Sequence, residues 1–312
     1  MTPEITVCIV HWNTPDDLRT CLDALLSSTS AANLELVVID NASLPDAIDA
    51  ISRDYPSITL VKNAINVGYA AGCNQAARVA TGEMLLFLNP DARVEPAAIA
   101  TLVMRIKTHP MTLAAPRLVW PDGRTQQAVT GVPDPMATFL EMSMLSRMSP
   151  SLDRWKQRWF DYEQDQPAVQ PMASCWLVPR VAWDAIGEMD EAFPLYFNDV
   201  DWALRASQAG WHFRYIPSAV VVHDHGGTTR SIKKDAIWES RRAFACFWMK
   251  HYKAHPLRPL MSVLLWVEAC LRTRQVRTPV WPARSEWRDS RSYFLLCLVG
   301  AQSRQRRRPQ KP

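Results

Sequence analysis

Side chains capable of chemistry gather in this 312-residue chain at points where short apolar segments end. The groups are Asp40-Asn41-Ala42-Ser43, Asn66-Val67-Gly68 with Asn74 beyond it, and Asn89-Pro90-Asp91. One such group alone is typical of an ordinary turn, where Asn, Asp, Ser and Pro are common. Three at the equivalent ends of neighbouring strands indicate a ligand site, because open α/β sheets bind ligands at the carboxyl ends of their strands.

Two further groups occur later in the chain. Asn198-Asp199-Val200-Asp201 opens a helical stretch, and acidic residues in a first turn are favourable for the helix dipole whatever their function. His223-Asp224-His225 follows a β-rich segment, where a pair of histidines can simply belong to a surface turn. Alternation along an extended chain aims both imidazoles to the same side. Both histidines are therefore candidate ligands.

The strands and helices that must position these groups alternate along the chain. Strands are expected at 5–10, 34–39, 58–61 and 84–88, helices near 14–26, 69–80 and 96–108, and a loop followed by a helix at 41–54. Thr14 suits an N-cap and Pro15 the first helical position. Repeated βα units of this length predict an α/β fold with a doubly wound, mostly parallel sheet.

The second half of the chain is less regular. Gly131–Pro171 contains five prolines, and we expect an irregular insertion with helix near Phe139–Arg147 and Leu152–Trp159. Further elements are predicted at 173–178, 198–209 (ended by Gly210), 211–216 and 219–223, and helices beyond Ser231. The predicted division is a catalytic domain at 1–230 and a helical, basic appendage at 231–312.

Several classes of protein are excluded by what the sequence lacks. The first strand ends in His11-Trp12-Asn13-Thr14 without glycine, and no GxxxxGK[ST] occurs, which argues against NAD enzymes and P-loop NTPases. The seven cysteines are scattered without a CxxC pair, so neither disulfides nor a zinc knuckle is indicated. The sequence begins without the features of a signal peptide, and a reduced cytosolic environment is expected.

The charge of the chain is uneven. Leu271–Pro312 holds 11 Lys/Arg and 2 Asp/Glu, a local charge of +9 against +4 for the whole chain. The apolar runs Leu260–Leu271 and Tyr293–Val299 are too short to cross a bilayer, which takes ~20 residues. Their Arg and Trp flanks favour an interfacial helix on anionic lipid. The alternative is a helical subdomain packed on the core or on a second subunit, as in a homodimer. No nucleic-acid-binding module is found.

The ordered motifs resemble a known family. VIDNAS, NVGYAAGCNQA, LNPDA, ASCWLVPRVAWDAIGEMDEAF, NDVDWALRASQAGW and HDHGGT are similar to family 2 glycosyltransferases of the GT-A fold. Within that family the resemblance is to the rhamnosyltransferase-like branch that builds bacterial surface polysaccharides. It extends over about Ile5 to Thr229.

The resemblance implies a role for each group. Asp40 would accept the imide N–H of a nucleotide base, with Asn41, Asn66, Gly68, Asn74 and Asn89 as further donor-site contacts. Asn89-Pro90-Asp91 stands where the family has DxD, so Asp91, with His223 or His225, would hold Mg²⁺ or Mn²⁺. Asp199 would be the general base, with Asn198 in place of the usual Glu. Asp190, Glu191 and Asp201 would border the acceptor.

The implied activity is inverting transfer of a hexosyl group to a hydroxyl of a polyprenyl-diphosphate-linked glycan. The implied donor is a nucleotide sugar such as dTDP-rhamnose, and the implied location is the cytoplasmic face of the inner membrane, peripherally bound. A nucleotidyltransferase is one alternative, although such enzymes usually need a Gly-rich loop after the first strand. The other is a non-catalytic, membrane-associated sugar-nucleotide-binding protein, against which Asp91, Asp199 and the histidines argue.

Overall fold

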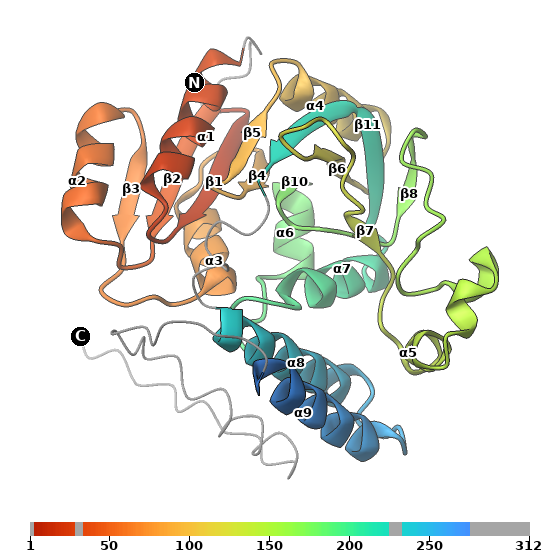
Figure 1. Ribbon diagram of the computed structural model, residues 1–312. Helices are drawn as coiled ribbons and strands as arrows, with labels where there is room; N and C mark the ends of the chain where they lie inside the picture. Colours follow the sequence, from red (N-terminus) through yellow and green to blue (C-terminus); the bar gives the residue numbers. More distant parts are fainter. Residues whose placement is uncertain (1–2, 29–33, 225–232, 275–312) are drawn as a thin grey trace. The chain divides into compact units, whose positions relative to one another are not determined.

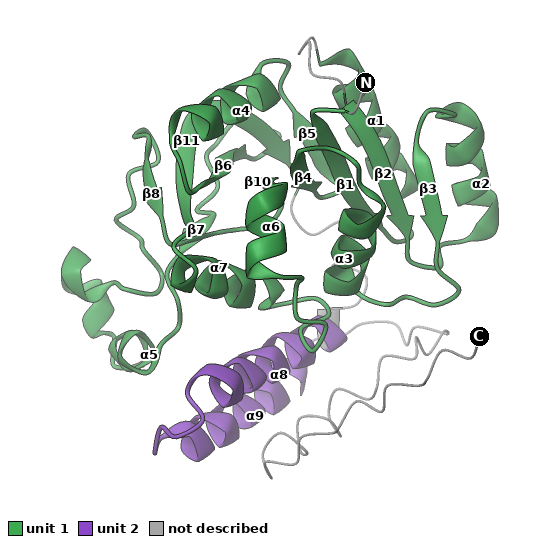
Figure 2. Cartoon of the chain, turned by 180° about the vertical axis from the view of Figure 1, so that it is seen from behind, with its two compact units in different colours: residues 1–231 green, residues 232–312 purple. Residues whose placement is uncertain are grey.

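The structure is a computed structural model that describes residues 3–28, 34–224 and 233–274. The chain divides into two compact units, residues 1–231 and 232–312 (Figure 2). The predicted boundary at residue 230 lies one residue from this division. His225, Tyr293–Val299 and most of the basic stretch Leu271–Pro312 lie outside the described residues.

A mixed sheet forms the centre of the first unit (Figure 1). Its strand order is β3-β2-β1-β4-β10-β6-β11-β5, with β8 paired to β11. The pairs β1–β2, β1–β4 and β2–β3 are parallel, whereas β10 is antiparallel to both of its neighbours. The strands are β1 Ile5–His11, β2 Leu34–Asp40, β3 Thr59–Lys62, β4 Met84–Leu88, β5 Ala92–Val94, β6 Thr112–Val119, β8 Gln166–Ala168, β10 Cys175–Pro179 and β11 His212–His223.

Helices cover both faces of this sheet, which confirms the doubly wound prediction. Successive residues of β1 separate into two cores, since Val7 and Ile9 point to one face and Cys8 and Val10 to the other. The first core contains side chains of α1 Pro15–Ser27, α2 Pro45–Asp54 and α4 Ala98–Thr108. The second contains those of α3 Tyr69–Val79, α6 Arg180–Ile186 and α7 Asn198–Gln208.

The insertion is less helical than predicted. It runs between the paired strands β7 Val129–Thr130 and β9 Gln170–Pro171, with α5 at Pro135–Met142 and short 3-10 turns at Leu145–Arg147 and Pro150–Leu152. The expected helix at Leu152–Trp159 is wrong. The Asp153 carboxylate accepts the Arg158 backbone N–H at 2.5 Å, and this loop contact replaces helical hydrogen bonds.

Two other expectations are corrected in detail. The separate strands predicted at 211–216 and 219–223 form one strand, β11, interrupted by an irregularity between Ile216 and Val220. Thr14 occupies the N-cap position of α1, but within the described part of the chain its hydroxyl makes no capping hydrogen bond.

The described part of the second unit, residues 233–274, contains the helices α8 Lys233–His251 and α9 Arg258–Arg274. They are joined by the Arg241 guanidinium, which donates to both carboxylate oxygens of Glu268 at 2.9 and 2.8 Å. Across residues 3–28, 34–224 and 233–274, every helix falls short of the length and apolarity that a membrane crossing requires.

Candidate active site

Asp40 lies at the carboxyl end of β2, directly opposite His11 at the end of β1. His11 Nδ1 is 3.1 Å from Asp40 Oδ1, and the Ser43 backbone N–H donates to Asp40 Oδ2 at 3.1 Å. The Thr14 N–H donates to His11 Nε2, so this nitrogen is an acceptor and Nδ1 carries the hydrogen. Burial raises the pKa of Asp40, but the hydrogen bonds from His11 and Ser43 outweigh it and lower the pKa. Asp40 is therefore a fixed carboxylate.

The loop before α3 is joined to this end of the sheet by side-chain amides. Asn41 Nδ2 donates to the Gly68 carbonyl at 3.1 Å, and Asn66 Oδ1 accepts the Gly68 N–H at 2.9 Å. Gly68 has φ +90°, and a Cβ there would lie 2.7 Å from Pro194 Cβ and 2.9 Å from its carbonyl oxygen. Only glycine fits this close approach without strain.

Asp91, the residue directly before β5, is brought to His223 at the end of β11, because β5 and β11 pair with His223 opposite Ala92. Asp91 Oδ1 lies 3.4 Å from His223 Nε2, so a nitrogen and an oxygen ligand face one another. His223 Nδ1 is 3.1 Å from Gln126 Oε1, which can only accept, and this places the hydrogen on Nδ1. Nε2 is thereby free of a hydrogen in the neutral ring and suited to a cation.

Asp91 and His223 alone do not make a metal site. Within the described ranges, no three His, Cys, Asp or Glu side chains gather closely enough to hold a metal ion. The residues present fit a divalent ion whose remaining ligands come from a substrate or from outside the described chain. Asp17, in the first turn of α1, is near enough to matter electrostatically: burial and then the charges of Asp91 and Asp224 raise its pKa. The Asp91 end of the sheet is thus strongly acidic.

Asp199 stands in the first turn of α7, between backbone and side-chain donors. Its Oδ1 accepts the Val200 N–H at 2.9 Å and its Oδ2 accepts the Gln170 amide at 2.9 Å. Thr130 donates its hydroxyl hydrogen to Gln170 Oε1 at 2.6 Å, which turns the amide nitrogen of Gln170 toward Asp199. Burial raises the pKa of Asp199, and hydrogen bonds from Val200, Gln170 and Ala173 offset only part of this increase. A carboxylate of this kind accepts a proton more readily than an exposed one.

The chain before β10 links Asp199 to the Asn89-Pro90-Asp91 motif. The Asn89 N–H donates to the Ser174 carbonyl at 2.9 Å, and Asn89 Nδ2 is 3.3 Å from Ser174 Oγ. The preceding residue, Ala173, hydrogen-bonds Asp199 through its backbone. The candidate base and the candidate metal motif therefore lie at the same edge of the sheet.

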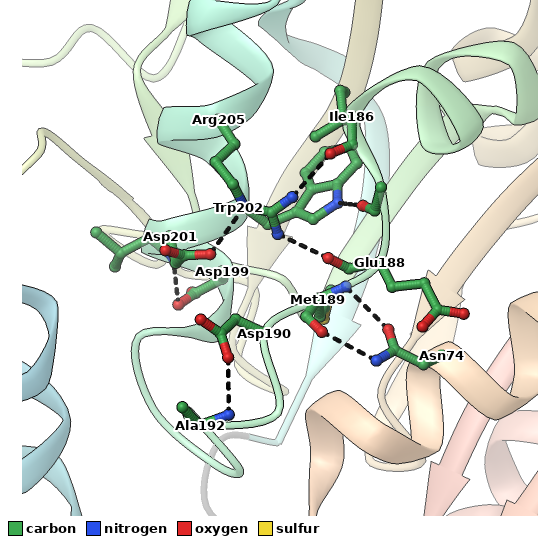
Figure 3. Close-up of polar contacts among 12 residues, drawn as sticks. Asn74, Ile186, Glu188, Met189, Asp190, Ala192, Asp199, Asp201, Trp202 and Arg205 are labelled. Carbon is green, nitrogen blue, oxygen red and sulfur yellow. Dashed lines mark hydrogen bonds and ion pairs between the residues drawn. The ribbon is translucent and has the colours of Figure 1, made fainter. Parts of the chain in front are cut away.

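Asp201 has a different environment, and its expected position at the acceptor is wrong. Its side chain is fully buried and accepts Arg205 Nε at 2.9 Å. The same guanidinium donates to the Ile186 and Glu188 carbonyls at 2.9 and 2.8 Å (Figure 3). A side chain enclosed in this way cannot reach a bound acceptor. It instead anchors the loop that precedes α7.

Asn74 is also directed at this loop. Its amide donates to the Met189 carbonyl at 2.9 Å and accepts the Met189 N–H at 2.9 Å (Figure 3). It also donates to the exposed Glu191 carboxylate at 3.1 Å. We therefore regard Asn74 as a positioning residue. Asp190 Oδ1 accepts the Ala192 N–H at 2.9 Å, which makes a local turn.

Sequence reasoning missed three contributors to the site: His11, Gln126 and Gln170. An ionisable residue at the end of the fully buried strand β1 was a signal that could have identified His11. Gln126 and Gln170 lie in irregular segments far along the chain from their partners. Their contacts follow from the tertiary fold, and no local pattern marks them.

Comparison with known proteins identifies relatives of this chain. Residues 6–146 match the profile of the family described as Glycosyl transferase family 2. An N-acetylglucosaminyl-diphospho-decaprenol L-rhamnosyltransferase of Mycobacterium tuberculosis is 27% identical over 248 residues, which are 73% of this chain and 78% of that protein. The O-antigen biosynthesis protein RfbC of Myxococcus xanthus is 26% identical over 263 residues, 82% of this chain. The match spans only 19% of the longer RfbC protein.

The fold also has solved counterparts. A mannosyltransferase from Pyrobaculum calidifontis, in complex with GDP-Man and Mn²⁺, aligns with a TM-score of 0.54 over 96% of this chain and 87% of its own. The two sequences are 15% identical, so this likeness concerns the fold. The fold is that of GT-A glycosyltransferases, as the motifs predicted.

Proposed function

We propose that this chain, whose residues 6–146 match the model of glycosyl transferase family 2, is an inverting hexosyltransferase acting on a lipid-linked glycan. The observation that carries the proposal is the position of Asp199. This carboxylate has a raised pKa and lies beside the chain segment that contacts Asn89, the first residue of the Asn89-Pro90-Asp91 motif. Inversion needs a base on the acceptor side, and Asp199 is suited to that role.

The donor would be bound at the carboxyl ends of β1, β2 and β4. Asp40, held as a carboxylate by His11, would accept the imide N–H of the base, and the loop at Asn66 and Gly68 would lie against the nucleotide. Asp91 and His223 would hold Mg²⁺ or Mn²⁺. The Mn²⁺ bound with GDP-Man in the Pyrobaculum enzyme supports a divalent ion here. Such an ion neutralises charge on the departing diphosphate.

The acceptor would attack the sugar ring on the face opposite to the departing diphosphate. As the acceptor hydroxyl oxygen bonds to the anomeric carbon, its proton passes to Asp199. The bond between that carbon and the diphosphate oxygen breaks, and the nucleoside diphosphate leaves with the bonding electron pair. Gln170 and the Val200 N–H would keep the carboxylate aligned during this step. Asp190 and Glu191, in the loop anchored by Asn74, would border the acceptor.

The finer assignment rests on the named relatives. The mycobacterial protein is an L-rhamnosyltransferase named for a diphospho-decaprenol glycan, and this supports dTDP-rhamnose as donor and a polyprenyl-diphosphate-linked glycan as acceptor. Such an acceptor would hold the reaction at a membrane, in our proposal the cytoplasmic face of the inner membrane. Residues 231–312 would assist through their basic, amphipathic segments, with homodimer packing as the alternative role.

A screen of nucleotide sugars tests the proposal. Purified protein is incubated with each radiolabelled donor and a lipid-linked glycan, with Mn²⁺ or with EDTA. We expect label to reach the lipid only with Mn²⁺ present and with dTDP-rhamnose among the active donors. Transfer of a nucleotidyl group would indicate the nucleotidyltransferase alternative. Donor binding without transfer to any acceptor would indicate a non-catalytic binding protein.

A further inference from the structure

Asn198, the first residue of α7, has a buried side chain to which the proposed reaction gives no role. Only 2% of the residue is exposed. Its Nδ2 donates to the Phe193 carbonyl at 3.1 Å and to the Leu195 carbonyl at 3.0 Å. Carbonyl oxygens only accept hydrogen bonds, so the amide nitrogen and not the amide oxygen has to face them. Both amide hydrogens are therefore used to hold residues 190–197, which we call the α7 loop.

Three consecutive carbonyls of the α7 loop are held from two sides. The middle carbonyl, that of Pro194, accepts the Tyr69 N–H at 2.6 Å. The outer two, those of Phe193 and Leu195, accept the amide hydrogens of Asn198. The loop is thus attached to the start of α3 by one carbonyl and to the start of α7 by two. Removal of the Asn198 donors would leave the contact with α3 in place.

The backbone at the end of the α7 loop has a conformation that needs support. Phe197 has φ +66°, in the left-handed region that residues other than glycine rarely adopt. Such a conformation persists where the surrounding contacts fix it. The Phe197 carbonyl accepts the Asp201 N–H at 2.9 Å inside α7, and Asn198 holds the Leu195 carbonyl on the other side of Phe197. The direction in which the chain enters α7 therefore depends in part on Asn198.

A carboxylate at this position could not make the same contacts. An ionised carboxylate has no hydrogen to donate, and it would place a negative charge against two carbonyl oxygens and beside Asp199. The α7 loop also carries Asp190, which Figure 3 shows near Asp199, and Glu191. These are the two residues that we propose border the acceptor. The orientation of the loop relative to α7 therefore sets where an acceptor would lie relative to the Asp199 carboxylate.

We propose that Asn198 is a positioning residue that holds the α7 loop, and with it the acceptor, in line with Asp199. The roles of acceptor and base in this statement rest on the proposed function, whereas the attachment of the loop by Asn198 does not. Because the Pro194 carbonyl stays bound to Tyr69, loss of the Asn198 donors should loosen the acceptor side of the loop and leave the donor side unchanged.

The test compares two substitutions of Asn198 in the full-length protein. Asn198→Asp keeps the shape of the side chain and removes both donors, whereas Asn198→Ser leaves one hydroxyl donor. The control, Gln166→Glu, replaces another amide that donates to a backbone carbonyl, that of Asp161, at 2.6 Å. Hydrogen exchange of backbone amides is measured without substrate. Sugar transfer to a lipid-linked glycan gives kcat/KM for the acceptor, and calorimetry with Mn²⁺ gives the Kd of the nucleoside diphosphate.

In Asn198→Asp we expect the Ala192 and Phe193 amides, both hydrogen-bonded to Asp190, to exchange about tenfold or more faster, since two hydrogen bonds that hold the loop are lost. Asn198→Ser should show a smaller increase, and Gln166→Glu none in this loop. The kcat/KM for the acceptor should fall by about tenfold or more in Asn198→Asp, because the acceptor is no longer aligned. The Kd of the nucleoside diphosphate should change by less than about twofold.

Unchanged exchange in both Asn198 variants would overturn the proposal, as would faster exchange with an unchanged kcat/KM for the acceptor. An equal loss of nucleoside diphosphate affinity would make Asn198 a general structural residue and contradict the assignment. If Asn198→Ser matches the parent in both measurements, the effect of Asn198→Asp comes from its charge and the proposal is wrong. If Asn198→Asp does not fold, Asn198→Ser alone decides. If the parent protein transfers no sugar, the proposed function fails, and the exchange result still decides whether Asn198 holds the loop.

Discussion

The two aspartates in the first turn of α7 should separate stability from catalysis. Asp201→Asn keeps the shape of the side chain but removes the charge that faces the Arg205 guanidinium at 2.9 Å. Arg205 also holds the carbonyls of Ile186 and Glu188. Without the carboxylate, the guanidinium remains in a mostly buried position with its charge uncompensated by this partner, and the loop before α7 loses its anchor.

The expected loss of stability follows from this geometry. Removing one partner of a buried ion pair costs about 3–5 kcal/mol. The Arg205 side chain keeps 21% of its surface exposed, so water can solvate part of its charge, and we expect the lower end of that range, about 3 kcal/mol. For a unit of this size, 1 kcal/mol shifts the melting temperature by about 2–4 °C, so Asp201→Asn should melt about 6–12 °C below the parent.

Asp199→Asn should behave in the opposite way. The pKa of Asp199 is raised in the folded protein, so its contribution to stability is present at low pH and is lost as pH rises through the folded pKa. At neutral pH the ionised carboxylate therefore costs stability, and Asn should leave the melting temperature unchanged or slightly higher. Transfer should fall by about 10²–10⁴-fold, because the proposed general base is gone.

The assay pairs differential scanning calorimetry with initial rates of sugar transfer, measured well below each melting temperature. Asp201→Asn should retain most of its turnover while folded. The reasoning is refuted if Asp201→Asn has the melting temperature of the parent and transfers sugar as slowly as we expect of Asp199→Asn. In that case Asp201 is the base and the buried pair with Arg205 is broken when substrate binds.

Three further predictions concern the remaining site residues. Gln170→Leu removes a hydrogen bond that lowers the pKa of Asp199, so the acid limb of the plot of kcat against pH should move to higher pH. An acid limb at the parent's pH would show that Gln170 only supports packing. Asp91→Asn should weaken Mn²⁺-dependent binding of the nucleoside diphosphate in calorimetry by about tenfold or more, and an unchanged metal dependence would remove Asp91 from the metal site. His11→Leu deprives Asp40 of a hydrogen bond and should raise the KM for the donor with little change in kcat. A fall in kcat as large as the rise in KM would instead place His11 nearer the reacting atoms.

The sheet edge that carries the site could be predicted from the sequence, because the signals involved are local. Buried strands read as continuous apolar runs, and the polar residues that end them must share an edge once the strands are parallel. This reasoning placed Asp40 correctly at the end of β2, and it placed Asn89 directly after β4. Asp91 and His223 were both assigned to one metal site, and the structure brings them within 3.4 Å.

What could not be predicted depends on contacts between distant segments. Asp201 was expected to border the acceptor, and only the fold reveals that its carboxylate is buried against Arg205. The family resemblance implied that Asn74 is a donor-site contact, yet its amide is engaged by Met189, 115 residues away. In the insertion, a helix pattern at 152–159 was overridden by the Asp153 side chain, which competes for backbone hydrogen bonds.

The fold couples the loop at Asn66 and Gly68, which we propose lies against the nucleotide, to the candidate base through the N-terminus of α3. The Tyr69 N–H donates to the Pro194 carbonyl at 2.6 Å, beside Gly68, and so fixes the loop that leads into α7. At the other end of the same residue, the Tyr69 hydroxyl donates to the Ala173 carbonyl at 3.0 Å, and Ala173 hydrogen-bonds Asp199 through its backbone. One residue thus joins both segments that hold the carboxylate. A base that must meet a donor sugar within a fraction of an ångström gains from being fixed to the donor's own loop, since any shift of that loop then moves both together.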